Sequence, residues 1–452
     1  MSVIAPKFRL GYLIKGITDN IFWIIILVTL IAIPVVQIVL IYIDFPIIDG
    51  EIWNPFRVLD AMTHPERALP LVKSFMQTDL FKVVAFPGFG FAALIAAAVI
   101  FVERKMLAKL QLRVGPFYCG KVEGILQLMG DGLKLISKEI IIPAKADKPL
   151  FWAAPVLFAA TAAAFVALIP VAPGWVVADI DLGLLAVFAV IGFFPIITIV
   201  SAWSANSKFP FIGGIRALFQ MVSFEIPLIL SLLGIVMLTG TLNLSEIVES
   251  QASFPWIIFM PIGAIVFFIC ILAELERIPF DLPEAETELT GGFHTEYSGM
   301  KFGVFQAAEF GAVLITSALI STLFLKGWEG PFLPSHVWFL LKLFFFAFIF
   351  IWIRATLPRL RIDQIMAYAW KFLLPLSLIN IFVVAAEILL LGEQITDSSG
   401  VRMDLTAGDM WIMAGINVVV AIVAVIGLSK ITGMDAKEST KVASATRIIE
   451  GT

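Results

Sequence analysis

The 452-residue sequence is poor in charge, cysteine and histidine. Only 15% of its residues are charged, and it holds two cysteines and three histidines. Soluble globular domains carry about 25% charged residues, so this composition excludes an ordinary soluble enzyme. The cysteines and histidines lack the spacing of metal ligands: Cys119, Cys270, His64, His294 and His336. We therefore expect no metal ion, iron–sulfur cluster or haem in this chain, and any such carrier to belong to a partner.

Hydrophobic residues, in contrast, make up 60% of the chain. A membrane-spanning helix needs roughly 20 predominantly apolar residues. The sequence lacks the alternating pattern of barrel strands, so we predict an all-α, polytopic integral membrane protein. Its ten predicted spans are residues 21–43, 83–102, 150–170, 182–203, 226–243, 255–273, 303–325, 335–353, 372–391 and 410–428.

The distribution of positive charge predicts how these helices are oriented. If successive spans alternate in direction, most of the 31 Lys and Arg residues fall on the side that holds both termini. Short cytoplasmic loops carry an excess of Lys and Arg. We therefore expect a multi-pass protein of the cell membrane with both termini in the cytoplasm.

One segment on that side is acidic instead. The stretch AELERIPFDLPEAETELTGGFHTEYSG begins at Ala273 and carries one basic residue, Arg277. If residues 281–290 are helical, Asp281, Glu284 and Glu288 share a face, and their mutual repulsion makes them titrate as a group. We predict a proton-relay segment there. Its acids are Glu274, Glu276, Asp281, Glu284, Glu286, Glu288 and Glu296.

The alternative interpretation is an exposed acidic loop in which Asp281 and Glu284 form a capping box after Pro279. Two features argue against it. Apolar residues, including Phe280, are interleaved with the acids, and further acids lie in or beside predicted spans at Glu225, Glu309 and Glu387. Because charge inside a bilayer is costly, an acid there is by default a functional candidate. The predicted proton path runs from the acidic segment through Glu225 and Glu309.

Arginines near the ends of spans predict a polar cavity opposite the acids. The guanidinium group suits buried pairing with carboxylates, which favours Arg104, Arg216, Arg277 and Arg354 as cavity residues. Phe224, Phe280 and Phe293 would supply apolar walls for a ring with a long tail. Lys105 and Lys109 fit simple anchoring of the helix at the membrane surface.

Several weaker features accompany these. The stretch LQLMGDGLKLISKE within residues 103–149 predicts an amphipathic helix lying at the interface or among partners. The pairs Gly213-Gly214 and Gly291-Gly292 are candidate close-packing points. His294 has a side chain suited to proton exchange. Lys342, in mid-span, has no assignable role.

Four stretches resemble one known family. They are ERKMLAKLQLRVGP at 103, AWSANSKFPFIGGIRALFQMVSFEIPL at 202, the acidic segment at 273, and RATLPRLRIDQIM at 354. In this order and spacing over residues 80–391, they resemble the membrane component of complex I that bridges to the peripheral arm, called the H subunit in bacterial enzymes. The first and last spans have no counterpart in that family's eight-helix core.

The resemblance implies domains and a function. Residues 1–79 would hold an extra helix and an external loop, residues 80–391 the quinone-chamber core, and residues 392–452 an extra helix and a cytoplasmic tail. Quinone would be the substrate, reduced by an iron–sulfur cluster in a peripheral partner protein, and its reduction would be coupled to proton pumping in distant antiporter-like membrane subunits. We therefore expect part of a multi-subunit quinone oxidoreductase, with no redox centre or catalytic residue in this chain alone and no nucleic-acid partner.

The resemblance also assigns residues. It places Arg104 and Arg113 at the chamber entrance, and Arg216, Glu225, Glu274 and Glu309 on a buried charged path. The acids from Asp281 to Glu296 would form a mobile loop by the chamber, and Arg354, Arg359 and Asp363 the block after the seventh core helix.

Two other functions stay open. A homologous component of a membrane-bound hydrogenase would have no quinone, and an independent secondary transporter would work alone. The chain lacks the internal repeats of many transporters. Relatives in this family receive electrons from NADH, ferredoxin or a reduced deazaflavin, and this sequence does not select among them.

Overall fold

The computed structural model describes residues 82–83, 88–119, 124, 126–251, 254–281, 291–391, 393–397, 400–404 and 407–431. Seven helical segments in this part of the chain are long and apolar enough to cross a membrane. They confirm the all-α, multi-span prediction. Some of the predictions concern residues outside the described ranges. They are the first span at 21–43, the external loop, the C-terminal tail, and the acids Glu284, Glu286 and Glu288.

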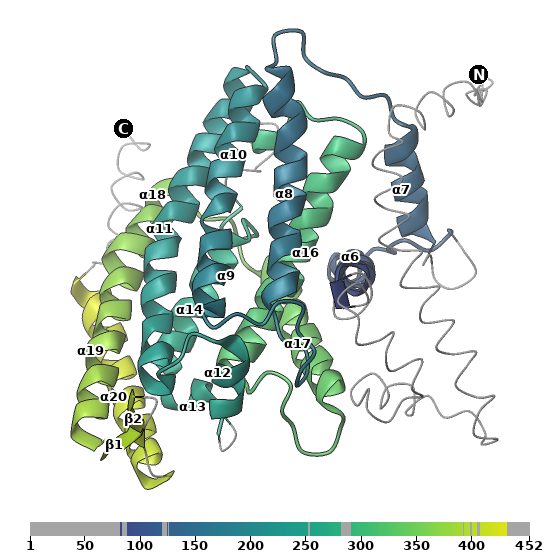
Figure 1. Cartoon of the computed structure of the whole chain (residues 1–452). Coiled ribbons are helices and arrows are strands. Elements are labelled where there is room, and N and C mark those ends of the chain that lie inside the picture. Colours follow the sequence, from purple (N-terminus) through teal and green to yellow (C-terminus); the bar gives the residue numbers. More distant parts are fainter. Residues whose placement is uncertain are drawn as a thin grey trace, which may run out of the picture.

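The long helices form an elongated bundle (Figure 1). Those that qualify as spans are α8 (Lys148–Leu168), α9 with α10 (Gly183–Ile191 and Phe193–Ser204), α11 (Lys208–Thr239), α16 (Met300–Phe324), α17 (Ser335–Thr356), α18 to α19 (Ile362–Tyr368 and Leu374–Leu391) and α20 (Ala407–Ile431). A π-helical turn, η3 (Ala369–Leu373), joins α18 to α19.

Helix α11 is central, since it packs against α10, α14 (Pro261–Glu274) and α19. The sequence predicted a span that begins at Ile226, but the helix begins 18 residues earlier, at Lys208. Its 32 residues are about 48 Å long, more than the ~30 Å hydrocarbon core. The charged residues Lys208 and Arg216 are the reason that the sequence predicted a loop for the first part of α11. The helix ends at Gly240, whose positive φ of 68° suits the residue after a helix.

Two other predicted spans differ from the structure. The segment 255–273 divides at Pro261 into α13 (Trp256–Phe259) and the 14-residue α14. The segment 83–102 corresponds to α6 (Phe89–Leu110), which is not among the seven spans. Figure 1 views α6 nearly end-on while α8 and α11 run along the page, so α6 crosses the bundle. Its second half carries four charged residues, Glu103, Arg104, Lys105 and Lys109.

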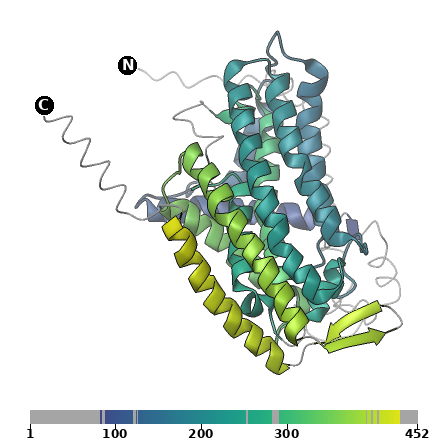
Figure 2. The same cartoon turned by 90° about the vertical axis from the view of Figure 1, so that its left-hand side faces the viewer.

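The shorter elements connect and cover the bundle. They are α7 (Gln127–Ser137), α12 (Leu244–Ser250), the 3-10 turn η2 (Gly292–His294) and a hairpin of β1 (Glu393–Asp397) with β2 (Gly400–Asp404). The amphipathic helix predicted in the segment 103–149 is α7, which lies at the edge of the bundle in Figure 1 and packs through Ile136 against Met300 and Val304 of α16. Figure 2 shows α20 along the outside of α19.

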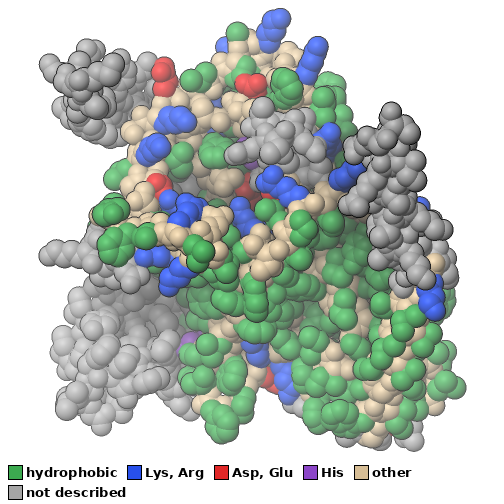
Figure 3. All heavy atoms as spheres, turned by 180° about the vertical axis from the view of Figure 1, so that it is seen from behind, with side chains coloured by type: hydrophobic (Ala, Val, Ile, Leu, Met, Phe, Trp, Pro, Cys, Tyr) green, Lys and Arg blue, Asp and Glu red, His purple; other side chains and the backbone are tan. Residues whose placement is uncertain are grey.

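Phenylalanine and glycine shape the interior. The fully buried large side chains are mostly phenylalanines, among them Phe151, Phe224 and Phe267. A Cβ atom at Gly213 would lie 2.9 Å from the backbone of Gly292, so both predicted glycine pairs meet at one contact between α11 and η2. Small residues allow such close approach of backbones in membrane bundles. In Figure 3 the lower half of the visible face is mainly hydrophobic, and most Lys and Arg side chains lie above it.

Candidate functional site

A buried ion cluster joins three distant parts of the chain. Nη1 of Arg277 donates to both carboxylate oxygens of Glu103, at 2.7 and 2.8 Å, and Arg354 donates to the same carboxylate. Glu103 is 2% exposed, and the Arg277 side chain 9%. A carboxylate this deeply buried is stable only when it is paired, and the two guanidinium groups provide that pairing.

The fold assembles this cluster from α6, the turn after α14 and the last turn of α17. The guanidinium of Arg277 also lies over the Phe310 ring, 4.6 Å from its centroid. Phe310 belongs to α16 and follows Glu309 directly. Arg277 and Arg354 therefore pair with an acid as predicted, but the acid is Glu103, which was not proposed as a site residue.

A second ion pair holds the start of the acidic segment. Nη2 of Arg359 lies 2.9 Å from Oδ2 of Asp281, whose side chain is 9% exposed. Asp281 is thus held inward rather than out in solvent. Gln220 of α11 fixes the same region, because its Nε2 donates to the carbonyls of Ala273 and Phe280, at 2.9 and 2.8 Å. No sequence motif marked Gln220, whose role depends on backbone 53 and 60 residues away.

Two acids of the predicted proton path, Glu225 and Glu274, lie on the packed helices α11 and α14. Both oxygens of Glu274 are shielded from solvent, and its carboxylate interacts electrostatically with that of Glu225. Glu225 lies in the middle of α11, not at the mouth of a span as predicted, and a Cβ at Gly192 would be 3.1 Å from its Oε1. Pro227, two residues later, lacks the N–H that would bond the carbonyl of Ser223. Helix α11 therefore lacks one backbone hydrogen bond close to Glu225.

Glu309 is half-buried within α16 and accepts a hydrogen bond from Gln306 at 3.0 Å. The next residue, Phe310, contacts Arg277 of the ion cluster. Arg216 is half-buried on α11, nine residues before Glu225.

The far end of the acidic segment is anchored in the core. Phe293 is 1% exposed and packs against Phe158 and Phe305, so its ring is part of the core. The hydroxyl of Tyr297 is 3.0 Å from that of Ser204, and its ring stacks on Phe151. Burial raises the pKa of Tyr297 to about 12, although the hydrogen bond with Ser204 lowers it in part.

Other predicted residues are placed as follows. Phe280 is buried in edge contact with Phe224, His294 is buried and Glu296 is half-buried. Asp363 is exposed, and its Oδ1 lies 3.5 Å from Nε of the exposed Arg361. Lys342 has a structural explanation, because its Nζ donates to the carbonyls of Leu325, Gly327 and Glu329 and so ties down the chain after α16.

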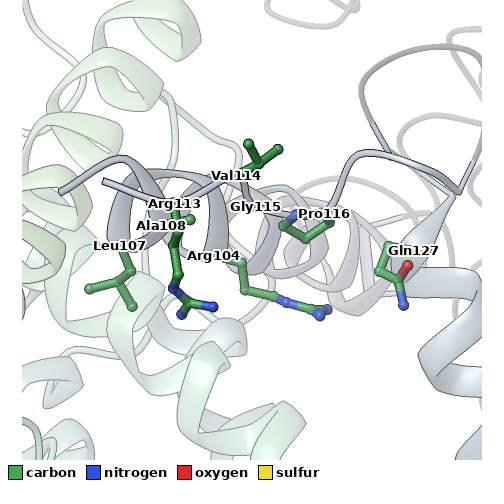
Figure 4. A pocket seen from close by; sticks show the side chains of 8 residues that line it. All are labelled: Arg104, Leu107, Ala108, Arg113, Val114, Gly115, Pro116 and Gln127. Carbon is green, nitrogen blue, oxygen red and sulfur yellow. The ribbon is translucent and has the colours of Figure 1, made fainter. Parts of the chain in front are cut away.

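An open pocket of about 440 Å³ lies between α6 and α7 (Figure 4). Arg104 and Arg113 line it with apolar residues and Gln127 of α7. Arg104 pairs with Asp131 of α7. Partial burial raises the pKa of Asp131, but hydrogen bonds from Gln127 and Arg104, with the charges of Arg104 and Lys134, lower it more, so the net shift is downward. The pocket thus combines cationic donors with apolar walls.

Within the described residues, no group of three or more His, Cys, Asp or Glu side chains is arranged to hold a metal ion.

Comparisons with known proteins agree on one family. A sequence model of NADH dehydrogenase matches residues 83–385. The H subunit of NADH-quinone oxidoreductase from Dehalococcoides mccartyi is 47% identical over 301 residues, which cover 67% of this chain and 85% of the relative. The H subunit from Bacillus cytotoxicus is 47% identical over 308 residues, 66% of this chain and 92% of the relative. An H subunit numbered 2, from Syntrophobacter fumaroxidans, is 44% identical over 309 residues, which cover 66% of this chain and 93% of the relative.

Proposed function

Because this chain belongs to the NADH dehydrogenase family that includes the H subunit of NADH-quinone oxidoreductase, we propose that it forms part of a quinone-binding chamber and couples quinone reduction to proton translocation. The chain is a multi-pass membrane component of a complex I-type enzyme. The observation that carries the proposal is that two acids on packed helices, the half-buried Glu225 of α11 and the shielded Glu274 of α14, interact electrostatically, with Glu274 three residues before the buried Arg277.

The proposed binding region is the pocket between α6 and α7. A quinone has a ring with carbonyl acceptors and an apolar tail. Arg104 and Arg113 supply donors, while Leu107, Val114 and Pro116 supply apolar surface. In this proposal the electrons come from an iron–sulfur cluster of a partner protein, and the chain itself binds no redox cofactor.

The proposed coupling is electrostatic. Reduction changes the charge beside the segment that begins at Asp281, which Arg359 holds and Gln220 ties to α11. A change of charge near interacting carboxylates redistributes their protons. Glu225 and Glu274 are suited to take up or release a proton in response, and Glu309 precedes Phe310, whose ring contacts Arg277. Glu284, Glu286, Glu288 and Glu296 would deliver protons to this path.

The test replaces one acid at a time in the assembled complex. In Glu225→Gln and in Glu309→Gln, we expect reduction of a water-soluble artificial acceptor to persist while quinone-coupled proton pumping into vesicles falls at least tenfold, because the amide cannot exchange a proton. Glu249→Gln is the matched control, since Glu249 is exposed near the end of α12. Normal pumping in both path variants would refute the relay.

A complex that contains nickel and reduces no quinone would instead identify the hydrogenase relative.

A further inference from the structure

The helix α20 lies beyond residue 385, where the match to the family ends, and a buried polar contact joins it to α19. Nδ2 of Asn417 on α20 donates to Oε2 of Glu387 on α19 at 2.8 Å. The same nitrogen lies 3.1 Å from the carbonyl of Met413. This contact plays no part in the function proposed above.

Both partners are buried. Glu387 is 3% exposed and Asn417 is fully buried, whereas most of the surface of α20 is exposed and apolar. Among the described side chains of α20, the buried ones are Met413, Ala414, Asn417 and Ala424. Asn417 is therefore the one polar group of this set on the face that meets the core.

This pair of side chains lacks one hydrogen-bond donor. Oε1 of Glu387 and Oδ1 of Asn417 are both buried, and neither has a hydrogen-bond partner among the described residues. An ionised Glu387 offers acceptors only, as does the amide oxygen. A single proton on Glu387 creates an O–H donor and also removes a buried charge, so it resolves both problems.

Among the side chains that the structure describes, no cation hydrogen-bonds Glu387 in place of that proton. The other titratable groups on α19, α20 and the elements packed against them are Lys208, Arg216 and Glu225 of α11, Cys270 and Glu274 of α14, Lys371 of η3, and Asp409 and Lys430 of α20. Lys430 is 13 residues from Asn417 and Lys371 is 16 from Glu387, about 20 Å or more along their helix axes. None of these groups hydrogen-bonds Glu387.

We propose that Glu387 and Asn417 form a proton-binding site within the membrane, in which a neutral carboxylic acid paired with a carboxamide fastens α20 to α19. When the proton is lost, Glu387 carries a buried negative charge and its Oε1 has no donor to share with Oδ1 of Asn417. The contact is then unfavourable, and α20 separates from α19.

Infrared spectroscopy of the assembled complex tests the protonation directly. We expect the carbonyl stretch of a neutral carboxylic acid at pH 7 that disappears in Glu387→Gln and shifts to higher frequency in Asn417→Leu, since the leucine removes its hydrogen bond. Glu249→Gln should leave this band unchanged. Absence of a Glu387-dependent band, or a band indifferent to Asn417→Leu, overturns the proposal. A band that sodium ions remove at constant pH would assign the site to a metal cation instead, which also overturns it.

A second measurement follows the position of α20. Spin labels at Leu389→Cys and Ile422→Cys report the distance between exposed positions of α19 and α20. In the otherwise native chain this distance should lengthen or broaden as the pH rises far enough to remove the infrared band. With Glu387→Gln it should stay constant, because the glutamine amide donates at every pH. A pH-dependent distance in Glu387→Gln would contradict the proton as the fastener.

Discussion

At the scale of single residues, a charge inside the bundle is explained by its partners. Lys342 lies in a span, which by default marks a functional position. Its ammonium nevertheless donates to three carbonyls and serves the structure. Glu103 follows an apolar run and looked like a boundary charge, yet it bonds two arginines in the interior. What distinguishes a structural charge from a functional one is therefore how fully its hydrogen bonds are made.

The Glu103 cluster provides a prediction at this scale. Glu103→Gln removes the charge that offsets Arg277 and Arg354, and breaking a buried ion pair costs about 3–5 kcal/mol of folding free energy. We expect a lower unfolding temperature of the purified complex. Asp363→Asn is the matched control, because that pair is exposed and such pairs contribute about 1 kcal/mol or less. Equal melting of the two variants would contradict a stabilising role for the cluster.

At the scale of elements, α11 organises the candidate site. It carries Gln220, which holds the end of α14, and Glu225, which interacts electrostatically with Glu274. The same helix meets η2 through Gly213 and Gly292. One continuous helix therefore positions the acidic segment at its two described ends, which a loop at residues 204–225 would not do.

The glycine contact predicts the effect of one added methyl group. In Gly213→Ala the new Cβ would lie 2.9 Å from backbone atoms of Gly292, which have no flexible side chain to move. Overpacking of this kind costs about 1–3 kcal/mol. We expect a lower unfolding temperature and slower quinone reduction. Gly311→Ala within α16 is the control, since its Cβ meets no atom within 4 Å. A neutral effect of Gly213→Ala would show that α11 and η2 can separate without consequence.

At the scale of the whole molecule, charge is segregated along the bundle. Lys and Arg side chains gather over the upper part of the face in Figure 3, and a hydrophobic surface lies below them. The positive-inside rule assigns the charge-rich end to the cytoplasm. That assignment is our proposal for the orientation of the chain, with both termini on the same side.

Native Cys119 makes the orientation testable. It is partly exposed in the segment after α6, whereas Cys270 is buried. A membrane-impermeant maleimide should label Cys119 in inside-out vesicles and not in right-side-out vesicles. Phe332→Cys in a Cys119→Ser background should show the opposite, because residue 332 is exposed in the connection between α16 and α17. Labelling of both from one side would refute this topology.

The sequence by itself determined the class of the protein and the types of residue at its site. Hydropathy and helical periodicity are local properties, so they predicted the membrane helices, the amphipathic α7 and the pairing of Arg277 and Arg354 with an acid. They misplaced the start of α11, because Lys208 and Arg216 look like loop residues when only the local pattern is read.

Which groups meet is set by the packing of the helices in three dimensions. Glu103 pairs with arginines 174 and 251 residues away, and Glu387 meets an asparagine of the additional helix α20. Such choices depend on how packed helices cross and on which buried charge lacks a partner. Neither is encoded in the spacing of residues along the chain.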